Sequence, residues 1–207
     1  DSSAGKTGKI TREKYFENSQ TTTSISVQKG SFTAEGITID GQIGNKIHTG
    51  DQVCLKNNPR VTVKLTNCTL INTVKTDTLI GGGMNIAFAY LANGIDVTID
   101  SCTADKGVYI SDGSGEKTVI NKSSLGELTL GGTAATVTET TTTGKAHLGA
   151  DEITIKDDSF VGLKIDGSGD TILENINSKG TSLNCALEIG GSGQITVKSG
   201  VYTNDNG

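Results

Sequence analysis

The sequence predicts an all-β fold in which short parallel strands stack into a solenoid. Three observations lead to this prediction. A unit of two short strands, closed by a Gly-Ser-Gly turn, recurs along the chain. Within each strand apolar residues alternate with polar ones, which is the period of a strand and not of a helix. Gly is abundant, with 28 residues, whereas Pro occurs once and Trp is absent, as expected for many strands joined by tight turns.

The repeat is clearest near the C-terminus, where residues 152–157, 161–166 and the turn 167–170 make one unit and the next begins at Thr171. From Ile120 to Leu173 the rungs are about 17 to 18 residues long. We expect equivalent first strands at 24–27, 37–40, 61–65, 96–100, 118–120, 136–137, 153–155, 172–173 and 195–197. We expect second strands at 52–55, 86–91, 108–110, 128–130, 146–148, 163–165 and 187–189.

A single rung cannot bury its apolar side chains alone, so each rung must be covered by its neighbours. The alternation therefore predicts one continuous core along the solenoid. Its expected members are Val97, Ile99, Ile120, Val137, Ile153, Ile155, Leu163, Ile165, Leu187, Ile189, Ile195 and Val197.

The first 23 residues are expected to form an N-terminal extension, with the β-solenoid domain over 24–207. Thr11 is a candidate N-cap for a short helix over 11–18, which would cover the exposed edge of the first rung. No comparable C-terminal cap is visible, so we expect contacts at the last rung, either end to end or with a longer parent protein. Two insertions, at 73–84 and 177–184, are either working loops or tolerated surface loops.

These repeats resemble those of the parallel β-helix proteins, the pectate-lyase-like group, from about residue 25 to residue 201. The resemblance implies a single-stranded parallel β-helix. The hexapeptide repeat of left-handed β-helices is absent, which favours the right-handed form. The resemblance also implies that a lyase would hold calcium with Asp or Glu and use Arg or Lys as base. Arg60 is a candidate for such a role, and its alternative is a solvated cation at a strand edge.

The best acidic cluster consists of Glu139, Asp157 and Asp158. Glu139 and Asp157 fall at equivalent positions of adjacent rungs, which places them roughly 5 Å apart. A calcium site or a catalytic carboxylate pair would fit this spacing. The alternative is a solvated face with Lys122 and Lys156 as counter-ions.

Other surface signals are weaker. Tyr109 is expected to point outward and could contact a glycan, as could Tyr202. His48 and His147 have no nucleophile at a meaningful spacing. An ice-binding surface needs an uninterrupted Thr array, and the column just before Ile99 is too interrupted for one. That column reads Lys64, Thr98, Val119, Thr136, Thr154, Ile172 and Thr196.

The four Cys residues have no metal-binding spacing. Cys68 and Cys102 follow equivalent strands, so they should stack on adjacent rungs, either as a disulfide or as two free thiols. We expect Cys54 and Cys185 to be buried and unpaired.

The net charge of −5 argues against a nucleic-acid partner, and no apolar run is long enough for a membrane span. The Ser/Thr/Asn/Gly-rich composition is typical of secreted bacterial surface proteins. We therefore predict a secreted, non-catalytic module, adhesin-like or virulence-associated, that contacts a glycan or a host-surface protein. The alternatives are a polysaccharide lyase or hydrolase and a structural stalk segment of a larger surface protein.

Overall fold

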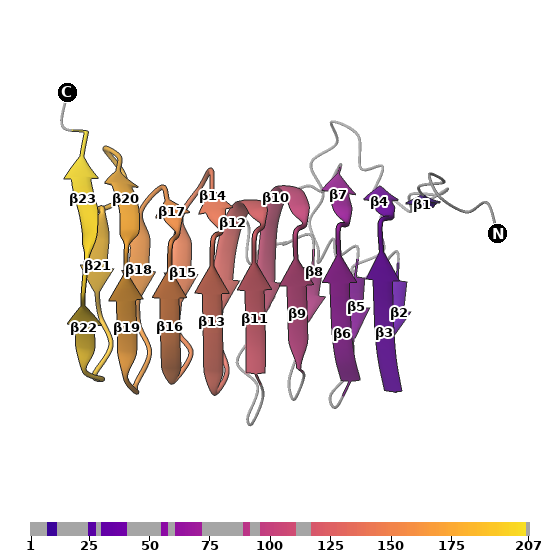
Figure 1. Ribbon diagram of the computed structural model, residues 1–207, viewed down its shortest axis with the longest axis horizontal. Helices are drawn as coiled ribbons and strands as arrows, with labels where there is room; N and C mark the ends of the chain where they lie inside the picture. Colours follow the sequence, from indigo (N-terminus) through magenta and orange to yellow (C-terminus); the bar gives the residue numbers. More distant parts are fainter. Residues whose placement is uncertain are drawn as a thin grey trace, which may run out of the picture.

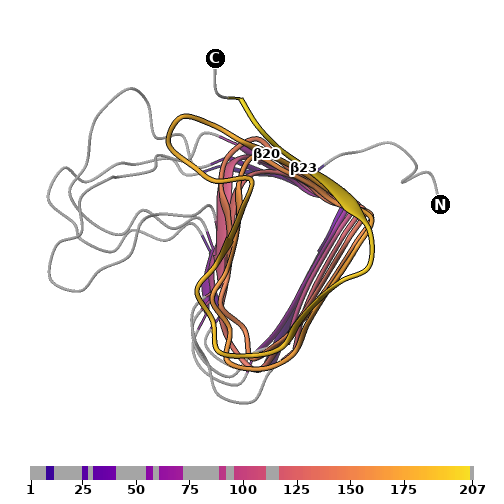
Figure 2. The same cartoon turned by 90° about the vertical axis from the view of Figure 1, so that its left-hand side faces the viewer.

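The computed structural model describes residues 8–11, 25–27, 30–40, 55–57, 61–71, 89–91, 96–110 and 117–205. Strands are the regular structure of this part of the chain, and they stack in parallel along one axis (Figure 1). The all-β parallel β-helix is therefore confirmed. Seen along the axis, each rung is roughly triangular and has three faces (Figure 2). The described residues include no helix that could cross a membrane.

The first face is a sheet of eight parallel strands whose register is continuous from end to end. Its strands are β3 (Gly30–Glu35), β6 (Val61–Thr66), β9 (Val97–Asp100), β11 (Lys117–Asn121), β13 (Ala134–Thr138), β16 (Glu152–Lys156), β19 (Thr171–Glu174) and β22 (Ile195–Val197).

The second face follows the first after a sharp corner. It consists of β1 (Lys9–Thr11), β4 (Thr38–Asp40), β7 (Thr69–Ile71), the first parts of β10 (Thr103–Ile110) and β12 (Ser124–Leu130), β14 (Thr141–Thr142), β17 (Ser159–Phe160), β20 (Ile176–Gly180) and β23 (Gly200–Asn204).

The third face closes the triangle. It consists of β2 (Ile25–Val27), β5 (Leu55–Asn57), β8 (Ala89–Leu91), the second parts of β10 and β12, β15 (Ala146–Leu148), β18 (Leu163–Ile165) and β21 (Leu187–Ile189). Because β10 and β12 run through the corner, the second and third faces form one bent sheet.

The predicted unit of two strands is therefore incomplete, because the strands of the second face were missed. Two first strands were also placed on the wrong face. β2, predicted at 24–27, belongs to the third face, and β4, predicted at 37–40, belongs to the second. The first-face strand of that rung is β3, which begins at Gly30.

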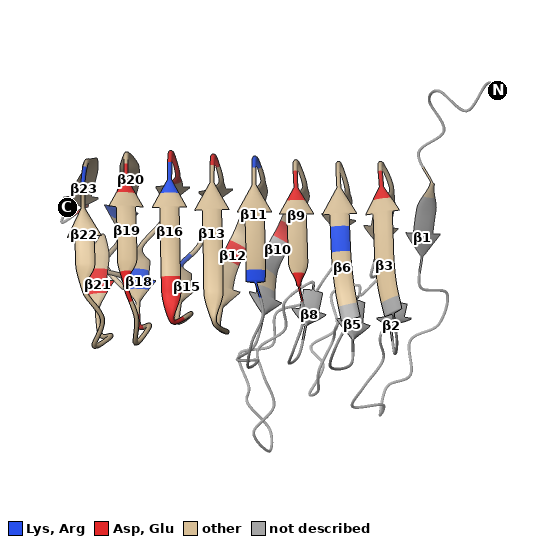
Figure 3. Ribbon diagram, turned by 60° about the horizontal axis from the view of Figure 1, so that its bottom comes forward, with Lys and Arg blue, Asp and Glu red and all other residues tan. Residues whose placement is uncertain are grey.

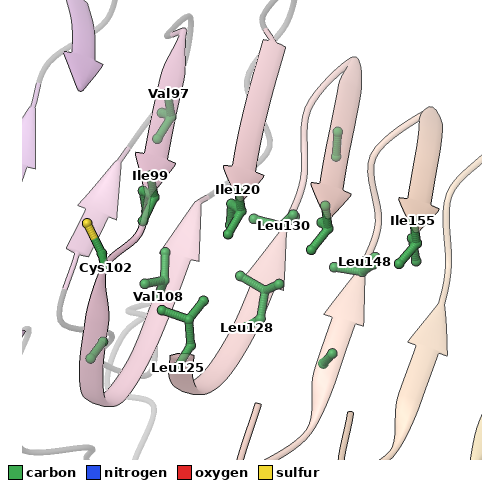
Figure 4. Packing of buried hydrophobic residues seen from close by; sticks show 14 of the residues in the cluster. Val97, Ile99, Cys102, Val108, Ile120, Leu125, Leu128, Leu130, Leu148 and Ile155 are labelled. Carbon is green, nitrogen blue, oxygen red and sulfur yellow. The ribbon is translucent and has the colours of Figure 1, made fainter. Parts of the chain in front are cut away.

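Eight of the twelve predicted core residues are confirmed as buried, with exposed fractions of 0 to 1%. Figure 4 shows several of them, together with Leu128, Leu130 and Leu148 of the third face, inside the solenoid. The prediction is wrong for Ile189 and Val197, which are 54% and 48% exposed, while Leu187 and Ile195 are partly buried. These four lie on β21 and β22, and no described strand pairs with β21 or β22 on the C-terminal side.

At the other end, Lys9–Thr11 forms strand β1, which pairs with β4 in parallel register. Thr11 is thus part of the sheet. The rest of the expected cap helix and the insertion at 73–84 lie outside the described residues. The handedness of the solenoid stays a prediction.

Candidate functional site

The corner between the first and second faces is built from residues in the left-handed backbone conformation. Each follows a first-face strand directly, and φ lies between 48° and 62° at all of them. They are Gly36, Asn67, Ser101, Lys122, Glu139, Asp157 and Asn175. Their backbone N–H groups donate to the next rung, as Glu139 does to the carbonyl of Lys156 at 3.0 Å. Glu139 and Asp157 therefore do occupy stacked positions, on an exposed corner.

The residue after each corner points inward, and five of these residues form a buried polar ladder along the axis. They are Cys68, Cys102, Ser123, Thr140 and Asp158, all at most 3% exposed.

Four of the five side chains accept the backbone N–H of the preceding rung, whereas the thiol of Cys68 donates to the carbonyls of Ala34 and Thr66. Cys102 Sγ accepts from Cys68 at 3.4 Å and Ser123 Oγ from Cys102 at 3.1 Å. Thr140 Oγ1 accepts from Ser123 at 3.4 Å, and Asp158 Oδ1 accepts from Thr140 at 2.5 Å. The hydroxyls also donate to the carbonyl two residues back, as Ser123 does to Asn121 at 2.8 Å. Every buried polar group of the ladder is thereby satisfied.

Asp158 ends the ladder, since the next rung has Ile176 at this position. Its second oxygen accepts the N–H of Lys156 at 3.0 Å. Burial raises the pKa of Asp158 to about 7, against the opposing effect of these two hydrogen bonds. Asp158 thus faces the core while Asp157 faces solvent, so the predicted acidic cluster does not converge on one spot.

The remaining predicted site residues are less informative. Arg60, His48 and Cys54 lie outside the described residues. Tyr109 lies in β10, in backbone register with Tyr90 of β8 and Thr129 of β12. Tyr202 is in register with the buried Ser178 and packs against the core, so the expectation that it points outward is wrong.

Among the described residues no group of three or more His, Cys, Asp or Glu side chains could hold a metal ion.

Cys185 is exposed, contrary to the prediction, because the neighbouring Ala186 takes the buried position. Cys68 and Cys102 are stacked as expected, and both thiols are free in this structure. Contact with the Cys68 thiol raises the pKa of Cys102 above its usual range, and burial of the Cys102 thiol adds to this effect.

Oxidation is expected to join Cys68 to Cys102, because thiols on adjacent rungs lie within the range that a disulfide spans. The bond would close a loop of 34 residues and stabilise the fold by about 3 to 4 kcal/mol. Non-reducing peptide mapping, with thermal melts before and after oxidation, tests this. Cys68→Ser should keep the ladder and abolish the crosslink. A crosslink that involved Cys185 instead would contradict the register.

On the first face, polar side chains at the carboxyl ends of the strands bind one another from rung to rung. Asn121 donates to Asp100 at 2.9 Å and accepts from Thr138 at 2.9 Å. Further along the same column, Glu174 pairs with Lys156 and Lys198, each at 3.1 Å. Figure 3 shows this face, with charged residues mainly at the strand ends. The polar side chains of this column therefore form most of their hydrogen bonds and ion pairs with one another.

On the third face, charged side chains also pair with one another from rung to rung. Lys164 lies 3.2 Å from Asp166 and 3.5 Å from Glu188, and Lys145 pairs with Glu188 at 3.3 Å. His147 Nε2 lies 3.3 Å from Asp166. These exposed pairs satisfy one another and contribute little to stability.

The second face differs, because it has an uninterrupted row of uncharged hydrogen-bonding side chains. The register places one member on each of seven successive strands, β4 to β20. The row consists of Thr38, Thr69, Thr103, Ser124, Thr141, Ser159 and Asn177. All are exposed or half-buried. Strand spacing makes the row about 29 Å long, with one group every ~4.8 Å. We call it the hydroxyl row.

None of the seven side chains of the hydroxyl row makes a hydrogen bond within the described part of the chain. The row lies two residues after each left-handed corner, as Thr141 follows Glu139. Sequence reasoning missed it because the Thr column considered there lies on the first face. Aligning the chain on the corner residues, not on the first strands, could have found it.

No protein-family model matches this chain, and no curated protein or solved structure is similar enough to count as a relative.

Proposed function

We propose that the protein is a non-catalytic binding module whose hydroxyl row holds an extended, uncharged glycan along the solenoid axis. The observation that carries this proposal is that the row is an uninterrupted series of seven uncharged polar side chains without a hydrogen-bonding partner in the described part of the chain. The charged columns of the first and third faces bind their own neighbours instead. Each Thr or Ser hydroxyl offers one donor and two acceptor sites, which is the complement that a sugar hydroxyl needs.

The regular spacing supports a polymeric ligand. A hydrogen bond exposed to water contributes only about 0.5 to 1.5 kcal/mol, so one hydroxyl would bind too weakly to matter. Several contacts along one chain act together, because the first contact raises the effective concentration of the rest. The row includes no charged side chain from Thr38 to Asn177, so we expect affinity to change little with salt.

The same proposal implies a location outside the cell, where extended glycans are found, in keeping with the secreted surface module predicted from composition. A parent protein that binds no glycan on the array would favour a host-surface protein as the ligand.

Replacing two central hydroxyls is expected to weaken glycan binding by about tenfold or more, from about 1 kcal/mol for each lost hydrogen bond. The variant is Thr103→Val with Thr141→Val, which keeps the shape and the strand preference of both exposed residues. The parent is first screened on a glycan array, and the affinity of each variant for the best neutral ligand is measured by calorimetry.

The matched control is Thr154→Val, an exposed Thr on the first face, which should bind like the parent. An equal loss in the control, or no loss in the double variant, would contradict the proposal. Assays for reducing sugars and unsaturated products on the ligands and on polyuronates test the enzymatic alternative. Product formation would favour a lyase or hydrolase.

A further inference from the structure

The middle of the first face is a stripe of uncharged, β-branched side chains. It runs over six successive strands, from β9 to β22, and the register places one outward member on each strand. Figure 3 shows the middle of these strands without charged residues. Side chains of this type suit packing against a second flat sheet. The members of this central stripe, all exposed or half-buried, are Thr98, Val119, Thr136, Thr154, Ile172 and Thr196.

The order of residue types in the central stripe reads the same from both ends. Its two apolar members, Val119 and Ile172, are each second from an end, and Thr takes the other four positions. A two-fold axis that runs along the strands, between β13 and β16, would lay Val119 of one copy against Ile172 of a second copy. The same axis would lay each Thr of the stripe against a Thr. An isologous interface requires this kind of self-complementarity.

The charged residues on both sides of the stripe match under the same axis. On the side where the strands begin, Lys117 would face Asp170 of the second copy, and both are exposed without an ion pair within the described residues. On the side where the strands end, Asp100 would face Lys198, which also pairs with Glu174 of its own copy. Each contact occurs twice because of the symmetry. From β9 to β22, neither flanking column then places two like charges opposite each other.

Other arrangements of the two faces bring like charges together. Sliding one copy by one rung places Asp96 opposite Asp170 in one direction, and Glu152 opposite Glu152 in the other. A two-fold axis along the solenoid would instead place Asp96 opposite Asp100. Such repulsions disfavour the alternative arrangements, so the order of charges selects one alignment of the two faces.

The stripe and its two flanking columns are large enough for a weak specific contact. Six strands spaced by ~4.8 Å, each with five residues that rise by ~3.3 Å, give a face of roughly 29 Å by 16 Å. Two such faces bury on the order of 1,000 Å² in total, which is at the lower limit for a specific interface. We therefore expect a dimer that dissociates on dilution.

We propose that the first faces of two copies of this chain pack against each other as an isologous dimer, with the solenoid axes antiparallel. The two-fold axis runs along the strands between β13 and β16. The central stripe forms the middle of the interface, and the charged columns form its rims. The contact closes on itself, so assembly stops at two copies. The hydroxyl row lies on the second face, outside this interface, and the inference does not rest on the proposed glycan binding.

Sedimentation equilibrium of the 207-residue chain between micromolar and millimolar concentrations tests the proposal. The parent is expected to pass from monomer to dimer without larger species. Asp170→Lys should weaken dimerisation by about tenfold, because it replaces two attractions to Lys117 with two repulsions. Combining Asp170→Lys with Lys117→Asp should restore dimerisation, since both contacts are then attractive again with their signs exchanged.

The matched control is Asp166→Lys, the same charge reversal in the same rung, directly after β18 of the third face. It should dimerise like the parent. A parent that stays monomeric at millimolar concentration would overturn the proposal, and so would growth into larger oligomers. The proposal would also be wrong if Asp166→Lys weakened dimerisation as much as Asp170→Lys, or if the charge-exchanged variant were no better than Asp170→Lys alone.

Discussion

Replacing Ile155 with Asp is expected to lower the free energy of unfolding by about 3 to 5 kcal/mol. Ile155 is fully buried, and its register partners Val137 and Leu173 are also fully buried. A carboxylate at this position would have apolar neighbours on both adjacent rungs and no hydrogen-bond donor in their side chains. Urea denaturation at neutral pH measures the loss.

Thr154→Asp is the matched control, one residue away on the exposed side of the same strand. It should cost less than about 1 kcal/mol, as surface substitutions generally do. If the two variants were equally stable, the inward and outward assignment of β16 would be wrong.

Replacing Asp158 with Thr is expected to stabilise the protein above pH 7 and to remove much of its pH dependence. In the folded state the pKa of Asp158 is raised to about 7 by burial, against an ordinary value of 3.8. Below about pH 4 both states hold the proton, and the folded state has its full stability. As pH rises from about 4 to 7, the unfolded state releases the proton first, so stability falls, and above pH 7 it is level. The total loss is on the order of 4 kcal/mol.

Thr suits position 158 because the ladder already has Thr140 one rung earlier. Its hydroxyl would accept the N–H of Thr140 and donate to the carbonyl of Lys156, as Thr140 donates to Thr138 at 3.0 Å. Thermal melts of parent and variant from pH 4 to pH 8 test the prediction. Asp157→Asn, at the exposed corner, should keep the parental pH profile. If the melting temperatures of Asp158→Thr and of the parent changed with pH in the same way, the prediction would be wrong.

The strand period predicted most of this fold. Alternation around Ile99, Ile120 and Ile155 defined both the inward positions and the order of the outward columns, and the first-face register agrees from β6 to β22. Some strands of the second face were missed because they are too short to alternate, and β20 was missed because two of its inward residues, Ser178 and Gly180, are not large apolar residues. β14 and β17 have two residues each, which in sequence look like turns.

The candidate site was harder to predict, for a local backbone reason. A left-handed residue such as Asp157 interrupts the alternation, so Lys156 and Asp157 are both exposed, and Asp158 takes the inward position that strict alternation would give to Asp157. Nothing in residue type marks that conformation when Lys122 or Glu139 adopts it in place of Gly. The predicted burial of Ile189 and Val197 was wrong for another reason. Whether an inward side chain is buried depends on a neighbouring rung as well as on its own strand.

The stacking of one rung on the next also has a consequence for how the chain folds. Parallel sheets usually form slowly, because their strands are joined by long crossovers that must close first. Here the partner of a residue in the central rungs lies only 17 or 18 positions away, as for Ser123 with Thr140 and Thr140 with Asp158, and the separation reaches 34 for Cys68 with Cys102. That separation gives a relative contact order of roughly 0.1, in the range of helical bundles. Folding can then start at any rung and spread in both directions along the axis, each new rung using the last as its template.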